Sequence, residues 1–394
     1  MIQLIRSLPP ICEGLMKQAI LVLTLLWLPV QASFAQGGGR DTGEVSREAQ
    51  LTIERGLDFL ARTQTIQTLD DGSLYGYWLC DIGYKLNYSY QITKTEGRHV
   101  GVTALACIAF LASGNLPGRG KYGRNVEAGL NYILSKVKDT GFITDEGAKG
   151  TRMYSHAFAT LFLAEVYGMT YRQDVRSKLK RAIDGIIKWQ NGQGGWRYLP
   201  LASDADLSVT VTQLQALRAA RNAGIQVNTA TIEKAIRYVV RCASADGAFK
   251  YQDLALSRDS FALTAAGLTS LFCAGIYDDE SQMLQQAISE QPGKNLPRMV
   301  SSGLEYLQEK RNTVQRRTYF YFYGHYYSAQ AMYIAGGKYW ENWYPMMRDE
   351  LINLQNTDGE EAGSWDCQVG QPFGTAMACI ILQIPYGYLP ILQR

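Results

Sequence analysis

Two aspartates beside a predicted helix are the residues of this chain best suited to acid chemistry. Asp204 and Asp206 are separated by one residue, and Ser208 follows them directly before an apolar helix pattern. Paired carboxyl groups that share one proton in a dry pocket are one way to tune an acid. Aspartate and serine at such a position also cap the free backbone amides of a helix. Two interpretations therefore stay open: Asp206 is a general acid assisted by Asp204, or it is a helix cap.

An aromatic-rich segment near the C-terminus is the second feature that suggests a site. Five consecutive aromatic residues, from Tyr319 to Tyr323, precede His325, and more tyrosines and tryptophans follow. Aromatic faces stabilise cations by about 0.5 to 2 kcal/mol per contact. Five consecutive rings cannot all face one side of a helix, so we expect many of them to pack in the core. Combining this segment with the predicted helix starts, we predict that a ligand is lined by His156, Trp196, Thr210, Tyr323, His325, Tyr326 and Tyr327.

A unit of about 55 residues recurs six times and must position these side chains. Each copy has an apolar helix pattern, a turn with glycine and an aromatic residue, and a second apolar helix. The turn aromatics are Trp78, Phe142, Trp196, Phe249 and Trp365, and a degenerate fifth copy lies around residues 304–310. Most second helices end on a glycine, which accepts the left-handed backbone conformation at little cost.

The spacing of apolar residues predicts an all-α fold. Apolar residues fall at steps of three and four, as in Leu105, Ile108 and Ala112, and no segment shows a convincing strand pattern. Six helical hairpins in one chain suggest a closed ring. An open solenoid is the alternative, and it would need polar capping repeats at both ends.

Composition is typical of one large domain. The chain has 394 residues, of which 46% are hydrophobic, and this is enough apolar material for a sizeable core. The formal net charge is only +3, so the strongly basic surface of a nucleic-acid-binding protein is not expected.

The first 35 residues have the three parts of a secretory signal peptide. Lys17 precedes an apolar run over residues 19–30, and small residues precede a cleavage point after Ala35. The run is too short to span a bilayer comfortably. We therefore predict a signal peptide over 1–35, a flexible Gly-rich lead-in over 36–47 and the toroid domain over 48–394. Export to the periplasm, cell envelope or extracellular space follows, with a retained membrane anchor as the alternative.

The repeats resemble those of the prenyltransferase and squalene-cyclase superfamily. The resemblance rests on repeats that close on a glutamine, glycines and a tryptophan, as in the turn from Gln190 to Trp196, and it covers about residues 48–390. It implies an (α/α)6 toroid of inner and outer helices. The same ring occurs in a thioester-containing branch, but the Cys-Gly-Glu-Gln run of that branch is missing from this sequence.

For the cyclase branch, the resemblance implies a role for the aspartate pair. Squalene cyclases carry an Asp-x-Asp-Asp-Thr-Ala motif whose middle aspartate protonates an alkene. Asp204 and Asp206 match the first two acids, Leu207 replaces the third, and Ser208 stands for the threonine. The resemblance therefore implies that Asp206 is the acid, but the missing third carboxyl group weakens the arrangement. These cyclases also usually contain two toroid domains, and this chain has one.

For the prenyltransferase branch, the resemblance implies a zinc site that this chain does not complete. Asp259 and His325 match an aspartate and a histidine of that site, but Phe261 stands where the cysteine should be. Two protein ligands fall short of the three that a catalytic zinc normally has. We predict no metal and no cofactor.

Two cysteines occupy equivalent places in the first and sixth repeats. Cys80 and Cys367 each follow the turn tryptophan by two residues. In a closed ring these repeats are neighbours, and in an exported protein the pair predicts a disulfide between Cys80 and Cys367. The alternative is that the cysteines are small buried apolar residues.

Three functions remain open from the sequence. The first is binding of an isoprenoid-like or other apolar ligand in a central cavity, with or without acid chemistry of the cyclase type. The second is a non-catalytic scaffold that binds a protein or glycan of the cell envelope. The third is a glycan-cleaving enzyme with two carboxylates across the ring, for which the residues near one mouth are Asp81, Asp145, Glu146, Asp206 and Asp253.

Overall fold

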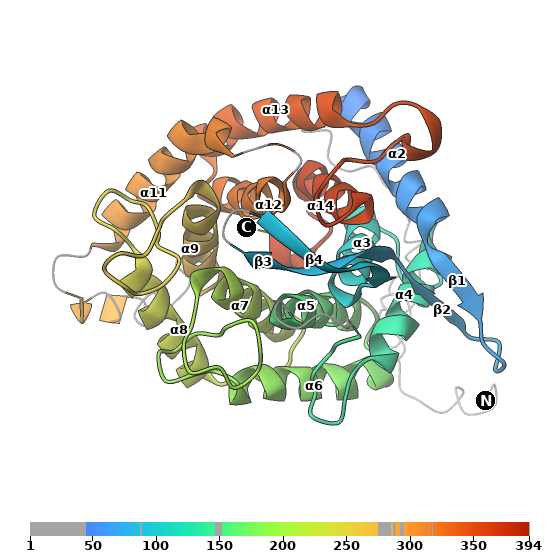
Figure 1. Ribbon diagram of the computed structural model, residues 1–394, viewed down its shortest axis with the longest axis horizontal. Coiled ribbons are helices and arrows are strands. Elements are labelled where there is room, and N and C mark those ends of the chain that lie inside the picture. Colours follow the sequence, from blue (N-terminus) through green and yellow to red (C-terminus); the bar gives the residue numbers. More distant parts are fainter. Residues whose placement is uncertain are drawn as a thin grey trace, which may run out of the picture. The chain divides into compact units, whose positions relative to one another are not determined.

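An inner ring of six helices surrounds the centre of the computed structural model (Figure 1). The structure describes residues 45–86, 89–145, 152–274, 285–286, 289–291, 295–314, 316 and 318–393. Within these ranges the inner helices are α3 (Val100–Ala112), α5 (Arg152–Thr170), α7 (Leu207–Asn222), α9 (Phe261–Cys273), α12 (Tyr319–Ala335) and α14 (Gln371–Gln383). Each contacts the next along the chain, and α14 contacts α3. The predicted ring is therefore closed.

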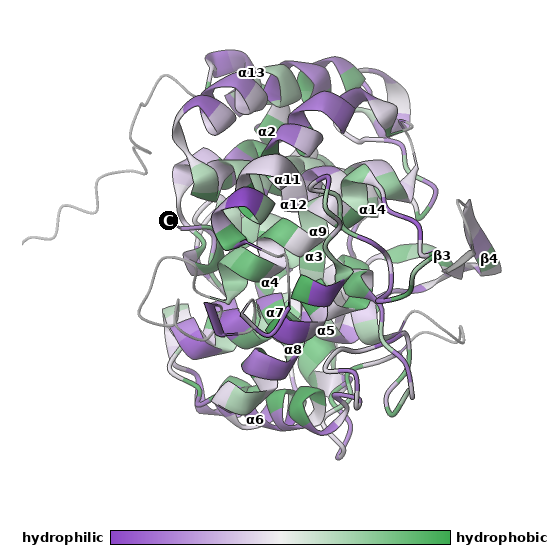
Figure 2. Cartoon of the chain, turned by 90° about the vertical axis from the view of Figure 1, so that its left-hand side faces the viewer, coloured by the Kyte–Doolittle hydropathy of each residue, from purple (hydrophilic) through white to green (hydrophobic). Residues whose placement is uncertain are grey.

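A second ring of helices surrounds the first. Its described members are α2 (Arg47–Thr63), α4 (Gly123–Ser135), α6 (Gln173–Lys188), α8 (Thr229–Cys242), α11 (Leu296–Lys310) and α13 (Gly337–Leu354). These helices are amphipathic: α6 buries Val175, Leu179 and Ile183 and exposes charged residues between them. The inner helices are buried on nearly every side and, apart from the more polar α7, are mostly apolar. Figure 2 shows that the outer helices α6 and α13 have more hydrophilic residues. The predicted (α/α)6 toroid of six helical hairpins is confirmed.

A local hydrogen bond holds the turn of each hairpin against its inner helix in five of the described repeats. A side chain in the first turns of the inner helix accepts from a backbone amide of the turn, at 3.1 to 3.3 Å. The acceptors are Thr103, His156, Thr210, Thr264 and Thr375. Each of three turn tryptophans also donates its indole N–H to a carbonyl of the outer helix. These hydrogen bonds therefore fix the glycine-aromatic turn against the inner helix. We call this arrangement the lock and its five acceptor residues the lock residues.

The prediction that the chain contains no strands is wrong. Strands β1 (Thr65–Thr68) and β2 (Leu74–Tyr77) pair antiparallel, and so do β3 (Leu79–Leu86) and β4 (Ser89–Arg98). The second hairpin is an insertion between a turn tryptophan and its lock residue, so it interrupts the helical repeat. Figure 1 shows it crossing the centre of one face of the ring, which we call the mouth.

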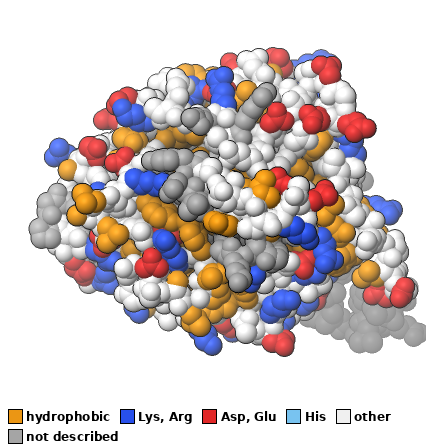
Figure 3. All heavy atoms as spheres, in the orientation of Figure 1, with side chains coloured by type: hydrophobic (Ala, Val, Ile, Leu, Met, Phe, Trp, Pro, Cys, Tyr) orange, Lys and Arg blue, Asp and Glu red, His pale blue; other side chains and the backbone are white. Residues whose placement is uncertain are grey.

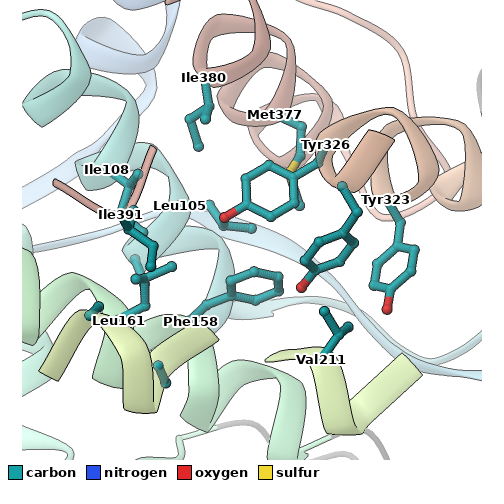
Figure 4. Packing of buried hydrophobic residues seen from close by; sticks show 14 of the residues in the cluster. Leu105, Ile108, Phe158, Leu161, Val211, Tyr323, Tyr326, Met377, Ile380 and Ile391 are labelled. Atoms are coloured by element: carbon teal, nitrogen blue, oxygen red, sulfur yellow. The ribbon is translucent and has the colours of Figure 1, made fainter. Parts of the chain in front are cut away.

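The C-terminal segment lies at the opposite face of the ring, which we call the floor (Figure 2). After α14, two short 3-10 helices, η4 (Ile384–Tyr386) and η5 (Pro390–Leu392), bring Ile391 and Leu392 into buried positions. Figure 4 shows Ile391 among side chains from the inner helices, including Ile108 and Leu161. The lumen is therefore filled at the floor.

The described residues, which begin at Val45, belong to one compact unit. The predicted signal peptide and most of the predicted lead-in lie outside the described residues. Among the described helices, none has the length and apolar character needed to cross a bilayer.

Ring closure uses packing and amide hydrogen bonds instead of the predicted disulfide. Cys80 and Cys367 are both free thiols in this structure, although they are close enough for Cys367 to raise the pKa of Cys80, after the larger effect of burial. The first and last repeats are joined by Gln355, which donates to the carbonyl of Thr52 at 2.8 Å, and by Gln383, which donates to the carbonyl of Ala109 at 3.1 Å.

Candidate functional site

One position of the repeat faces the lumen at the mouth. It lies two residues before each lock residue and before His325, on the first turns of the six inner helices. The residues at this position are Gly101, Tyr154, Ser208, Ala262, Tyr323 and Phe373, and every one of them lines a cavity. Their sizes differ widely, so the repeat supplies a symmetric frame with an asymmetric lining.

Two cavities open at the mouth and share Tyr319 and Tyr323. The larger has a volume of about 260 Å³ and is bounded by the first turns of α9 and α12, with Arg258 and Asp259 at its rim. The smaller, of about 70 Å³, lies between α3, α5 and α14, and Tyr90 of β4 forms part of its wall. Figure 3 shows the face that carries the mouth, where apolar side chains are visible among charged ones. Most of the lining is aromatic or aliphatic.

Asp206 is the N-cap of α7 and is fully buried. Its Oδ1 accepts from the amide of Val209 at 2.9 Å and from the hydroxyl of Ser208 at 2.6 Å. Its Oδ2 lies 3.6 Å from Nη1 of Arg197. The cap interpretation is thus what the structure shows, and Asp206 has no exposed surface with which to contact a ligand directly. Asp204 is half exposed and lies 3.5 Å from Arg197, so the two aspartates differ in burial.

Ser208 links Asp206 to two tyrosines of the mouth. The hydroxyl of Tyr154 lies 2.6 Å from Oγ of Ser208, and the hydroxyl of Tyr323 donates to the carbonyl of Ser208 at 2.7 Å. Burial raises the pKa of both tyrosines well above the ordinary value, and the negative charge of Asp206 adds to the shift. Both phenols are therefore neutral at physiological pH.

Two arginines and two tyrosines form a layer beside Asp206. The guanidinium of Arg197 lies 4.9 Å from the ring centroid of Tyr198, and that of Arg258 lies 5.2 Å from that of Tyr251. The hydroxyls of Tyr198 and Tyr251 form a hydrogen bond with each other. Arg197 of this layer places positive charge next to the buried carboxylate of Asp206.

Three of the predicted ligand-lining residues belong to the lock instead. Trp196 is buried and donates its indole N–H to the carbonyl of Ile186, while Thr210 accepts from the Trp196 amide. His156 accepts from the amide of Ile143 and packs against Phe142 and Trp189. Burial lowers the pKa of His156 to about 3, so its imidazole is neutral. The physical reason is that these side chains point between the inner and outer rings.

The residues of the incomplete zinc set do not come together. His325 is buried against Phe261 and Tyr321, whereas Asp259 is exposed at the mouth, near the hydroxyl of Tyr306. Burial lowers the pKa of His325 to about 3. Within the described ranges, no group of three histidines, cysteines or acids could hold a metal ion.

The remaining predicted tyrosines lie deeper than the mouth. Tyr326 donates to Oε1 of Gln215 at 3.1 Å and packs in the lumen with Phe158 (Figure 4). Tyr327 is fully buried, and its hydroxyl has no hydrogen-bond partner among the described residues. Of the seven predicted lining residues, only Tyr323 borders a described cavity.

The carboxylates considered for a glycan-cleaving site form ion pairs with basic side chains or lie outside the cavities. Asp145 pairs with Arg98 and Lys136, and Asp253 pairs with Arg241. Asp81 borders neither cavity, and Glu146 lies outside the described residues. Among the described residues, Asp259 is the sole carboxylate that lines either cavity.

Tyr154 is the residue of this site that sequence reasoning missed. A signal for it was present, because Tyr154 precedes His156 by two residues just as Tyr323 precedes His325. Aligning the repeats on the lock residue, instead of on the start of the apolar pattern, would have identified both tyrosines and Ser208 together.

Comparison with known proteins supports the fold. No family model matches the sequence, and no curated protein matches it. Similar solved structures include a cellobiose 2-epimerase from Bacillus thermoamylovorans, with a TM-score of 0.58, 13% identity, and coverage of 85% of this chain and 98% of that chain. A family 76 α-mannanase from Bacteroides thetaiotaomicron has a TM-score of 0.58 at 10% identity, with 88% and 98% covered.

A type II terpene cyclase from Scytonema is also similar, with a TM-score of 0.52 and 12% identity over 88% of this chain and 99% of that chain. That structure contains geranylgeranyl dihydroxybenzoate as its substrate. All three are toroids whose sequences have diverged far from this one, so the likeness establishes the toroid and leaves the chemistry to the site.

Proposed function

We propose that this protein binds a small ligand with an apolar body in the mouth cavities, after export from the cell. The observation that carries the proposal is the lining of the cavities. Tyr319 and Tyr323 line both, and apolar side chains such as Phe261 and Leu263 line the larger one. Such walls favour flat or branched hydrocarbon groups, and a few polar groups then orient the ligand.

The rim supplies those polar groups. Arg258, Ser260 and Thr318 line the larger cavity, and the last two cap α9 and α12. All six inner helices point their N-termini toward the mouth, which gives this end a positive potential. We therefore place one polar group of the ligand at the rim and its apolar body along Tyr319 and Tyr323.

The size and charge of the cavities favour an isoprenoid-like ligand over a glycan. A volume of about 260 Å³ lies near the lower end of small-molecule sites. It suits a short prenyl chain better than an oligosaccharide. A glycosidase of the common type also needs two carboxylates, and only Asp259 lines the cavities.

The test is a calorimetric titration that compares the binding of farnesol with the binding of cellobiose and of α-1,6-mannotriose. Val314→Trp should fill the larger cavity from its loop side and weaken farnesol binding at least about tenfold. Leu51→Trp places the same ring on the exposed face of α2 and should leave binding unchanged. Binding of either sugar without farnesol would refute the proposal in favour of a glycan site.

A further inference from the structure

A chain of hydrogen bonds connects the buried Asp206 with the lumen at the mouth. Ser208 donates to Asp206 at 2.6 Å, and the hydroxyl of Tyr154 lies 2.6 Å from the same serine oxygen. Ser208 lines the larger cavity and Tyr154 the smaller one. The carboxylate itself borders neither cavity, so any effect it has on a ligand passes through these two hydroxyls.

The hydrogen-bond partners of Asp206 and Ser208 determine which atom donates the proton at each step of the chain. The Asp206 oxygen accepts from two donors, the Val209 amide and the Ser208 hydroxyl. Because the only proton of Ser208 is directed at Asp206, its oxygen must accept the proton of Tyr154. The order is therefore phenol to serine to carboxylate, which is the order of a chain that moves protons toward Asp206.

The surroundings disfavour the storage of negative charge on Tyr154. Asp206 is fully buried, and Arg197 stands 3.6 Å from its second oxygen. The same carboxylate disfavours a phenolate on Tyr154, whose pKa is raised by burial first and by Asp206 second. Tyr154 can lose its proton to Ser208 only as it gains another or forms a new bond.

We propose that Tyr154, Ser208 and Asp206 form a proton relay that accepts a proton from a hydroxyl group of a ligand in the mouth cavities. This rests on the proposed function in one respect, namely that a ligand occupies these cavities. The ligand O–H bond breaks and its proton goes to the oxygen of Tyr154. The Tyr154 proton goes to Ser208 and the Ser208 proton to Asp206. Asp206 ends as a neutral acid, and the negative charge resides on the ligand oxygen.

Tyr323 provides an internal comparison. It lines both cavities, as a neighbour of Tyr154, with ring centroids 6.3 Å apart. Its hydroxyl donates to the backbone carbonyl of Ser208, which cannot pass a proton on. The relay therefore predicts a reactive oxygen on Tyr154 and an ordinary one on Tyr323.

The experiment uses phenylmethanesulfonyl fluoride, whose aryl group suits the aromatic lining, and peptide mass spectrometry of the full chain. The Tyr154 oxygen attacks the sulfur, the S–O bond forms, fluoride leaves, and the phenolic proton passes through Ser208 to Asp206. We expect Tyr154 to be modified at least tenfold faster than Tyr323 at neutral pH. Ser208→Ala and Asp206→Asn should each reduce the rate at Tyr154 at least tenfold.

Two features of these variants separate a relay from a merely structural role. Asparagine is as good an N-cap as aspartate, so Asp206→Asn keeps the cap while it removes the proton acceptor. Ser208→Thr restores a hydroxyl and should recover the labelling rate that Ser208→Ala loses. Melting temperatures of all variants show whether they fold.

Three results would overturn the relay: Tyr154 is not labelled, it is labelled no faster than Tyr323, or its rate is the same in folded Asp206→Asn. Labelling of Ser208 in place of Tyr154 would also overturn the assignment of Tyr154. These outcomes are independent of the farnesol titration. Relay-dependent labelling without farnesol binding would refute the ligand class and leave the relay intact.

Discussion

The mouth and the floor of this toroid are built from opposite ends of the same six helices, yet only the mouth contains a described cavity. At the floor, Ile391 and the surrounding aliphatic side chains fill the lumen (Figure 4). At the mouth, the equivalent positions range from Gly101 to Tyr323, and the unequal sizes leave space. The repeat therefore determines the ring, whereas a site arises where the lining departs from symmetry.

Two hydrogen-bond networks of buried polar groups, one below the mouth and one at the mouth, differ in whether they reach a cavity. Below the mouth, Tyr326 donates to Gln215, Gln215 donates to Gln330, and Gln330 donates back to the Tyr326 carbonyl. This set is closed on itself and borders no described cavity. At the mouth, the Asp206 chain ends on a tyrosine that borders a cavity. A closed network stabilises packing, while an open one can exchange protons with a ligand.

The largest expected effect is a loss of stability when the apolar packing at the floor is disrupted. Ile391→Asp puts a charge into an apolar site beside Glu165, whose own charged form accepts a hydrogen bond from the Ile391 backbone. We expect the free energy of unfolding to fall by about 4 to 5 kcal/mol, measured by urea denaturation. Gln393→Asp, at an exposed position two residues later, should change it by less than about 0.5 kcal/mol. Equal effects of the two variants would show that the floor is not packed as described.

A smaller effect, with a defined pH dependence, is expected at Glu165. Burial raises the pKa of this carboxyl from 4.5 to about 8, so the folded protein holds the proton more tightly than the unfolded chain does. Its contribution to stability therefore falls as pH rises from about 4.5 to about 8. Glu165→Gln cannot ionise, and at pH 8 it should be more stable than the wild type by about 4 kcal/mol.

Urea denaturation of both proteins at pH 5 and pH 8 measures this difference. Glu48→Gln, on the exposed face of α2, should leave the pH profile of the wild type unchanged. A Glu165→Gln variant whose stability relative to the wild type is the same at both pH values would contradict the assigned pKa.

The smallest effect distinguishes two neighbouring tyrosines of α12. Tyr323 donates a hydrogen bond to the Ser208 carbonyl, whereas the buried hydroxyl of Tyr327 has no partner among the described residues. Tyr323→Phe should lower the free energy of unfolding by about 1 kcal/mol, and Tyr327→Phe should leave it unchanged or raise it. Thermal and urea unfolding of the matched pair measure this, and the reverse order would contradict the hydrogen bond assigned to the hydroxyl of Tyr323.

Much of the fold was predictable because its signals are local. Apolar residues at helical spacing, glycines after most of the second helices and an aromatic residue in most of the turns all act over a few residues, and the unit that contains them recurs six times. The hairpin β3–β4 was not predictable in this way, because it occurs once and interrupts the first repeat. The free state of Cys80 and Cys367 was also beyond the repeat pattern, since equivalent positions do not guarantee the geometry of a disulfide.

The sequence by itself determined the six helical hairpins and the presence of acidic, aromatic and histidine residues near their turns, whereas the contact between α14 and α3 in the structure showed that the ring is closed. Only the tertiary structure decided which of them face the lumen. The side chains of Trp196 and His156 lie between the two rings. Asp206 is buried and hydrogen-bonded to Ser208, whereas Tyr154 lines a cavity. The physical reason is that a cavity is the space left after all side chains have packed, so its lining depends on the rotation of each helix within the ring.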